Sequence, residues 1–280
     1  MSLVSGRDVL AAARGGGYAV PAFNVFNLEM VQAVCRAAEA ERAPVIVQVS
    51  PRSIRYAGLH PLAAIAAALA DPADAPIVLH LDHGPNLAAC TAALKAGFTS
   101  VMFDGASLPL DENAARTRDV VKAAHGAGAS AEAELGEIGH ATDVATPAVL
   151  TDPPDAGHFV QGTGVDALAV AIGTVHGMRR TGATLDIGRI AELHRNVDAA
   201  LVMHGSSGVD DETLVRAIAA GITKVNLSTA LQAVFMDTLR ESAGRPGHET
   251  DARGVLAEAR DAVTEAMRQR IKIVGAAGRA

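Results

Sequence analysis

Aromatic residues and cysteines are scarce in this sequence of 280 residues. Aromatic residues make up 3% of it, tryptophan is absent, and there are two cysteines. Cys35 and Cys90 lie in separate helical patterns, and two thiols do not make the disulfide framework typical of small secreted proteins. We therefore expect a reduced, cytoplasmic protein whose core is built from aliphatic side chains.

Runs of positive charge and long apolar segments are also missing. The formal net charge is −7, and no basic cluster occurs, which argues against nucleic acid or an anionic membrane as a partner. The longest apolar run, residues 62–70, is far shorter than the ~20 residues that span a bilayer. The first residues show no apolar segment behind a basic start, so we expect no secretory signal.

Short β-type runs alternate with helical runs along almost the whole chain. Hydrophobic residues make up 49% of the sequence, and their aliphatic character suits short buried strands covered by Ala-rich helices. Strands are predicted at residues 19–23, 45–49, 77–81, 100–103, 130–135, 167–172, 200–203 and 224–227. Eight βα units in steps of roughly 30 residues predict a closed (β/α)8 TIM barrel more readily than an open sheet. We expect a single domain over residues 1–280, with an extra helix at each end.

Polar residues collect just past the C-terminal ends of the predicted strands. They are Asn24, Gln48, Ser50, Asp82, His83, Asp104, Glu134, His176 and residues 204–207 and 226–229. In a barrel all strand ends of this kind meet at one face, where catalytic groups are found. Ordinary loop polarity would require eight independent coincidences, so we interpret this ring as an active site.

Three histidines of this ring, His83, His176 and His204, each directly precede a glycine. One histidine at a strand end is usually structural, but three neutral imidazoles from three strands leave an open coordination position, as in catalytic zinc sites. Asp82 and His83 are adjacent and would point to opposite faces of a strand. Both reach one site only if the strand ends there, and Gly84-Pro85 predicts such an end.

Two segments after the last predicted strands are rich in small polar residues. His204-Gly-Ser-Ser-Gly208 precedes the helix that begins near Asp211, and Asn226-Leu-Ser-Thr229 enters the helix after the eighth strand. A tight turn capped by Ser would explain either segment alone. Barrel enzymes commonly bind phosphate at these last two loops, through small residues and helix N-termini. Together the two segments therefore favour a phosphorylated ligand.

Seven segments carry a family resemblance. They are Tyr18-Ala-Val-Pro-Ala-Phe-Asn24, His80-Leu-Asp-His-Gly84, Ser100-Val-Met-Phe-Asp-Gly105, Glu132-Ala-Glu-Leu-Gly136, Ala169-Val-Ala-Ile-Gly-Thr-Val-His-Gly177, His204-Gly-Ser-Ser-Gly208 and Lys224-Val-Asn-Leu-Ser-Thr229. Through them the sequence resembles the class II fructose-bisphosphate/tagatose-bisphosphate aldolase family along essentially its whole length. The sequence looks most similar to the tagatose-type subgroup, whose members are shorter than the classical fructose enzymes. The combination of these segments is specific to the family, although any one tetrapeptide from them would be weak evidence.

The resemblance implies a role for each matching residue. His83, His176 and His204 would hold a zinc ion, and Asp82 would donate and accept the proton of the aldehyde-side hydroxyl. The nearby carboxylates of Asp104 and Glu134 would steady or transiently bind the metal. Substrate and phosphate contacts would come from Gly177, Gly205, Ser206, Ser207, Asn226, Leu227, Ser228 and Thr229, with further substrate contacts from Asn24 and Ser50. A monovalent cation near the phosphate site and a homo-oligomer, dimer or tetramer, are also expected.

The reaction implied is reversible cleavage of a ketose (bis)phosphate to dihydroxyacetone phosphate and an aldehyde. Fructose 1,6-bisphosphate and tagatose 1,6-bisphosphate are the expected substrates. The metal would act as a Lewis acid, while Asp82 moves the proton of the C4 hydroxyl. No Schiff-base lysine is required, since Lys95 and Lys122 lie on predicted helices and Lys224 is predicted to begin a strand at the end opposite the site.

The loop after the fifth predicted strand departs from the family pattern. Members usually carry a Gly-Gly pair followed by an acidic cluster, with a Glu that exchanges a proton at the carbanion carbon. Here His140 replaces the second Gly, and Thr142 stands about where that Glu would be. Asp143 and His140 are the candidate loop bases. The departure bears on the substrate more than on the reaction class.

Other activities stay open at this point. The phosphorylated deoxy-keto-gluconate of inositol catabolism is an alternative substrate for a class II aldolase. A zinc hydrolase on the same barrel usually has a His-x-His pair at the end of the first strand, where Phe23-Asn24-Val25 stands here. A non-catalytic binding module would need no proton shuttle, so Asp82 argues for an enzyme.

Overall fold

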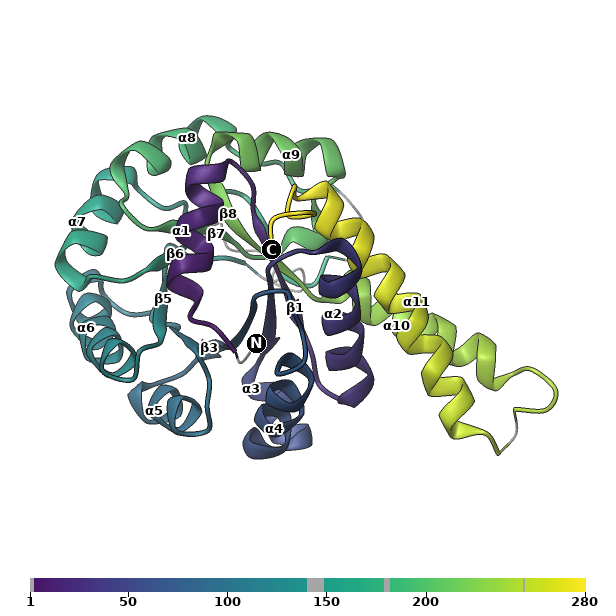
Figure 1. The fold of residues 1–280 in the computed structure, drawn as a ribbon. Helices are drawn as coiled ribbons and strands as arrows, with labels where there is room; N and C mark the ends of the chain where they lie inside the picture. Colours follow the sequence, from purple (N-terminus) through teal and green to yellow (C-terminus); the bar gives the residue numbers. More distant parts are fainter. Residues whose placement is uncertain (1–2, 140–148, 179–181, 249) are drawn as a thin grey trace.

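The computed structural model describes residues 3–139, 149–178, 182–248 and 250–280. Within them, eight parallel strands pair in chain order and close into a barrel, with helices arranged around the outside (Figure 1). The strands are β1 (Val20–Asn24), β2 (Val45–Val49), β3 (Ile77–Gly84), β4 (Ser100–Phe103), β5 (Ser130–Leu135), β6 (Ala167–Val170), β7 (Ala200–Met203) and β8 (Ile222–Leu227). The predicted TIM barrel is confirmed.

Most helices follow a strand and cover the outside of the barrel. They are α2 (Leu28–Glu41), α3 (Pro51–Ala57), α4 (Leu59–Ala70), α5 (Leu87–Lys95), α6 (Leu110–Gly126), α7 (Pro153–Thr163), α8 (Ile187–Asn196), α9 (Asp211–Ala220) and α10 (Thr229–Ala243). Polar side chains begin many of them: Asn27 accepts a hydrogen bond from the Met30 N–H at 3.1 Å, and Asn86 accepts one from Ala89 at 2.9 Å. Such caps satisfy N–H groups that the first helical turn leaves unpaired.

Two helices lie outside the eight βα units, as predicted. α1 (Gly6–Gly16) covers the N-terminal end of the barrel, where the Arg14 guanidinium donates to the Val197 carbonyl at 2.8 Å, shortly before β7. α11 (Ala252–Ile273) packs against α2 and α10, and the α10–α11 pair projects beyond the barrel (Figure 1). No helix in the described part of the chain has both the length and the apolar character needed to cross a membrane.

The element boundaries differ from the predictions mainly at the barrel mouth. β3 continues to Gly84 instead of ending at residue 81, and β6 ends at Val170 instead of at residue 172. The short helix α3, which the sequence analysis did not predict, directly follows β2. Ser50 caps α3 by accepting a hydrogen bond from the Ser53 N–H at 3.3 Å. As a result, α3 brings additional side chains to the C-terminal end of the barrel.

Candidate active site

A cavity of about 880 Å³ opens at the C-terminal end of the barrel. Among the described residues predicted for the site, two do not line it, because their side chains are buried: Leu227 in β8 and His204 directly after β7. The loop candidates His140 and Asp143 lie outside the described residues. The predicted residues that line the cavity are Asn24, Ser50, Asp82, His83, Asp104, Glu134, His176, Gly177, Gly205, Ser206, Ser207, Asn226, Ser228 and Thr229.

A bulge in β3 brings Asp82 and His83 into the same cavity. The register of the β3–β4 pairing shifts between Leu81 and Gly84, and His83 has a left-handed φ of 48°. Both side chains therefore line the cavity, which the ordinary alternation of a strand would prevent. β3 ends at Gly84, directly before Pro85 as predicted, but Asp82 and His83 are still within the strand, and its bulge brings both of them to the cavity.

Gly84→Ala should destabilise the protein, because an added Cβ would lie 2.3 Å from the Met102 carbonyl oxygen and 2.9 Å from Cys90 Sγ. Overpacking of this kind usually costs about 1–3 kcal/mol. Gly162→Ala is the matched control, since a Cβ at this helical position meets nothing within 4 Å and Ala is favoured over Gly in a helix by roughly 0.5–1 kcal/mol. Urea unfolding measures both variants, and equal stabilities would contradict the close approach at Gly84.

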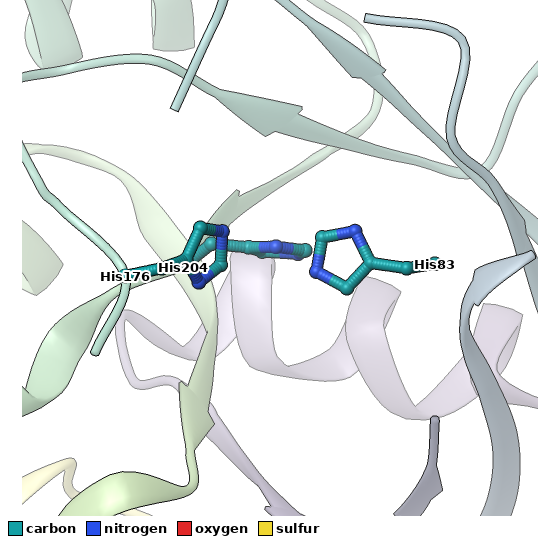
Figure 2. A group of neighbouring side chains, drawn as sticks. All are labelled: His83, His176 and His204. Atoms are coloured by element: carbon teal, nitrogen blue, oxygen red, sulfur yellow. The ribbon is translucent and has the colours of Figure 1, made fainter. Parts of the chain in front are cut away.

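Three imidazoles converge at the C-terminal end of the barrel, from β3 and from the segments after β6 and β7 (Figure 2). His83 and His176 line the cavity, and His204 is fully buried beside them. The ring centroids are 5.3 Å apart for His83 and His176, 4.9 Å for His83 and His204, and 5.6 Å for His176 and His204. One nitrogen from each ring lies within 4.8 Å of the others, which is compatible with a shared metal ion. His204 Nδ1 is buried and has no hydrogen-bond partner among the described residues, which a metal ligand atom would explain.

Neighbouring carboxylates decide which ring nitrogen two of these histidines present. Asp104 Oδ2 lies 2.8 Å from His83 Nδ1, and Glu132 Oε1 lies 3.2 Å from His204 Nε2. A carboxylate only accepts hydrogen bonds, so each contacted nitrogen carries the proton. The lone pairs left for a metal are therefore on Nε2 of His83 and Nδ1 of His204. Contacts of this kind set the tautomer of metal-binding histidines.

Acidic side chains crowd the histidine cluster. Burial raises the pKa of Glu134 to about 8, and the negative charge of Asp104 adds to the effect. Burial lowers the pKa of His83, but the charge of Asp82 and the other carboxylates outweighs it and raises the pKa to about 10. A divalent cation held by the imidazoles would relieve this accumulation of negative charge. The donor set and its surroundings therefore fit a metal of the zinc type.

Asp82 is buried beside the histidine cluster and is held in place by amide side chains. Its Oδ1 lies 3.8 Å from His83 Nε2, and its Oδ2 accepts a hydrogen bond from Asn24 Nδ2 at 2.8 Å. Asn226 Nδ2 lies 3.5 Å from Oδ1, and Gln48 donates to Asn24 Oδ1 at 3.1 Å. Burial raises the pKa of Asp82, but the positive charge of the neighbouring histidines outweighs it and lowers the pKa. An ionised, oriented carboxylate of this kind can accept a substrate proton.

The two predicted phosphate segments lie next to each other at the cavity. The Ser206 hydroxyl, in the loop after β7, donates to the carbonyl of Asn226 in β8. Gly205 has a φ of 66°, and an added Cβ would lie 2.8 Å from the Val175 carbonyl oxygen, so a larger residue does not fit. α10 begins at Thr229 beside this loop. Small residues and a helix start leave backbone N–H groups accessible to an anion.

Six residues that the sequence analysis did not single out also line the cavity. Phe26 and Tyr56 form part of its wall, with ring centroids 6.2 Å apart in an edge-on arrangement. A predictive signal existed for α3, because Ser50-Pro51 is an N-cap followed by a proline in the first helical turn. The six are Phe26, Arg52, Ser53, Tyr56, Ile138 and Gln232.

Lys224 lies in the barrel interior below the cavity, not away from the site as predicted. Its Nζ is 2.6 Å from Glu132 Oε2, and the other oxygen of Glu132 contacts His204. The prediction was wrong because β8 begins at Ile222, so Lys224 is inside the strand and its long side chain reaches the layer of side chains under the histidine cluster.

Comparison with known proteins places this architecture in a family. Residues 4–279 match the family model of class II fructose-bisphosphate aldolase. The crystal structure of the YdjI aldolase from Escherichia coli K12 is 32% identical over 99% of both chains, with a TM-score of 0.90. A candidate fructose-1,6-bisphosphate aldolase from Coccidioides immitis is 32% identical over 97% of this chain and 96% of its own, with a TM-score of 0.88. The fructose-bisphosphate aldolase (Fba) of Campylobacter jejuni shares the fold at 21% identity, over 100% of this chain and 97% of its own, with a TM-score of 0.86. The chain belongs to the class II fructose-bisphosphate aldolase family.

Proposed function

We propose that this protein is a zinc-dependent aldolase that reversibly cleaves a ketose bisphosphate, fructose 1,6-bisphosphate or tagatose 1,6-bisphosphate, to dihydroxyacetone phosphate and an aldehyde. The observation that carries the proposal is the position of Asp82. Its carboxylate lies 3.8 Å from His83 Nε2, in the same cavity that both phosphate segments line. Family membership supports a carbon–carbon lyase.

The histidine cluster and Asp82 would divide the chemistry between them. His83, His176 and His204 would hold the metal, which supplies a Lewis acid for the negative charge that develops on the ketose oxygen as the bond breaks. Asp82 would take the proton of the C4 hydroxyl in cleavage and return it in condensation. Asn24 orients the carboxylate for this transfer through its 2.8 Å hydrogen bond.

Backbone N–H groups would recognise the phosphate next to the ketose carbonyl. The protein carries a net charge of −7, and the loops after β6, β7 and β8 place Gly177, Gly205 and Ser228 on the cavity wall. Exposed N–H groups in small-residue loops and at a helix start bind phosphate without a large positive patch. We therefore expect the dihydroxyacetone phosphate half to lie on the β6–β8 side of the cavity.

A cleavage assay across ketose phosphates, with and without a chelator, tests the proposal. Fructose and tagatose 1,6-bisphosphates differ at C4, the carbon whose hydroxyl Asp82 would deprotonate, so the two rates identify the stereochemistry that the cavity accepts. We expect dihydroxyacetone phosphate to be released from at least one of them, with the activity lost on chelation and restored by zinc. Full activity without bound metal, or no cleavage of any ketose phosphate, would refute the proposal.

Arg52 lies on the side of the cavity that the aldehyde half would occupy. β1 separates β8 from β2 in the barrel, and Arg52 belongs to α3, directly after β2. A ketose bound by phosphate near β8, with its C4 hydroxyl at Asp82 on β3, therefore extends toward α3. Among the described residues that line the cavity, Arg52 is the only Lys or Arg. Its guanidinium suits an anionic group at the far end of the substrate.

Arg52→Met should raise the KM for glyceraldehyde 3-phosphate about 10–100-fold, because a hydrogen bond to a charged group contributes about 1.5–3 kcal/mol. The KM for dihydroxyacetone phosphate should stay unchanged. Arg55→Met is the matched control, since Arg55 belongs to the same helix but does not line the cavity. Condensation kinetics with each reactant varied in turn measure both constants. A parallel rise in the two KM values, or an equal effect of Arg55→Met, would contradict this placement.

A further inference from the structure

A buried ion pair lies in the barrel interior, below the histidine cluster. Lys224 and Glu132 are 1% and 2% exposed, and Lys224 Nζ is 2.6 Å from Glu132 Oε2. Lys224 Nζ also lies 3.4 Å from His80 Nε2, whose Nδ1 is 2.7 Å from the Ser100 hydroxyl. Removing two charges from water is costly, and apolar residues of similar volume often make a protein equally or more stable. Stability alone therefore does not account for a pair at this position.

The pair is connected directly to one of the proposed metal ligands. Glu132 uses one carboxylate oxygen for Lys224 and the other for His204 Nε2, at 3.2 Å. The His204 ring is fully buried, and its opposite nitrogen, Nδ1, lies 3.7 Å from Glu134 Oε2. Neither Nδ1 nor that oxygen has a hydrogen-bond partner among the described residues. The contact with Glu132 therefore determines which nitrogen of His204 is available on the cavity side.

Three strands of the barrel fix this arrangement. Glu132 is in β5, His204 follows β7, and Lys224 is in β8, so the side chains meet across the barrel interior and none of them is held by a flexible loop. Lys224 anchors the Glu132 carboxylate and balances its charge.

We infer that Glu132 and Lys224 are positioning residues that hold His204 in the tautomer and ring orientation required for metal binding. The inference rests on the proposed function, because it assumes that His204 is a metal ligand. The alternative is that the pair only fills the barrel interior.

Paired neutral substitutions separate these two roles. Glu132→Gln or Lys224→Met alone would leave one buried charge unpaired, so both single variants should be strongly destabilised. The double variant E132Q/K224M carries neither charge and should unfold near the wild-type midpoint. In this variant the side-chain amide at position 132 can either accept a hydrogen bond from His204 or donate one to it, so the amide no longer selects one tautomer of the His204 ring. E132M/K224M removes the polar contact altogether and provides a second neutral variant.

Zinc affinity is the decisive measurement, by competition between the zinc-loaded enzyme and a chromophoric chelator. We expect E132Q/K224M to bind zinc about 10–100-fold more weakly than wild type, the usual effect of losing the partner of a metal-binding histidine, and E132M/K224M to bind at least as weakly. Nitrogen-15 NMR of the metal-free proteins should show His204 protonated on Nε2 in wild type and a mixture of tautomers in E132Q/K224M. The control E41Q/R268M removes another ion pair, between α2 and α11, and should leave zinc affinity unchanged.

The results distinguish failure of the inference from failure of the proposed function. If wild type binds no zinc at His204, the proposed function fails, and this inference fails with it. The other case is that wild type binds zinc and a folded double variant keeps both the wild-type zinc affinity and a single His204 tautomer. Only the inference is then overturned, and the pair is structural.

Discussion

Asp82→Asn is expected to reduce carbon–carbon cleavage by about 10²–10⁴-fold, the usual contribution of a general acid or base, while the protein keeps its zinc. The substitution preserves size but removes the carboxylate that is proposed to accept the C4 hydroxyl proton. Asp82 also accepts a hydrogen bond from Asn24 at 2.8 Å, and the new amide would retain an oxygen for this contact. The loss should therefore appear in kcat, with a smaller change in KM.

Isotope exchange into dihydroxyacetone phosphate provides an internal control for Asp82→Asn. This exchange requires the metal and a base at the carbon next to the carbonyl, but dihydroxyacetone phosphate has no C4 hydroxyl. The variant should therefore exchange at close to the wild-type rate while cleavage is lost. Wild-type cleavage by Asp82→Asn would show that the proton shuttle lies elsewhere. Equal loss of exchange and cleavage would show that the substitution had damaged the metal site instead.

His204→Ala should lose both the metal and the activity. A metal acting as a Lewis acid lowers the barrier to cleavage by several kcal/mol, so its removal corresponds to a rate loss of about 10³-fold or more. Metal analysis after dialysis should find zinc in wild type and almost none in the variant. The substitution removes the contact between Glu132 and His204, but the Glu132 carboxylate is still paired with Lys224 at 2.6 Å. The barrel should therefore fold.

A second histidine variant shows whether the loss is specific. His158 lies exposed on α7, outside the cavity lining, and His158→Ala should keep both zinc and activity. Thermal unfolding should confirm that His204→Ala is folded at the assay temperature. If folded His204→Ala retained zinc and wild-type cleavage, the metal would have to be held without it, and the proposed ligand set would be wrong.

The barrel and most of the cavity lining were predictable because they follow from local signals. Most strands are short, largely aliphatic runs with polar residues at or shortly after their C-terminal ends, and parallel strands bring those ends to one face. The three histidines could therefore be grouped without knowledge of their distances. Family membership and the (β/α)8 fold were confirmed.

Irregular backbone and contacts across the barrel were less accessible. Nothing in residues 77–84 indicates a bulge, because a left-handed φ at His83 is stable only when the neighbouring strand accepts the shifted register. Leu227 was expected at the substrate from its place in a motif, but the inward and outward alternation of β8 buries its side chain.

The polar layer below the cavity had a signal that the sequence analysis left unused. Residues two apart on a strand share a face, so His80 points the same way as Asp82, Glu132 as Glu134, and Lys224 as Asn226. Applying this rule to all three strands would have placed a second polar layer under the site. The pairing of Lys224 with Glu132 would still have required the strand register, because residues 92 positions apart meet there.

The left-handed backbone at His83 limits how the metal preference of the proposed site can change. Among residues other than Gly, His, Asn and Asp are the ones enriched at positive φ, whereas β-branched residues are strained there. Position 83 therefore accepts an imidazole or a short carboxylate among common metal ligands. His176 and His204 have no such constraint, because neither has a positive φ. His83→Asp would shift the site toward metals that prefer oxygen ligands, such as magnesium or manganese, without a change in the backbone of the strand. Ligand residues that are strained at positive φ would first require a different backbone at this position.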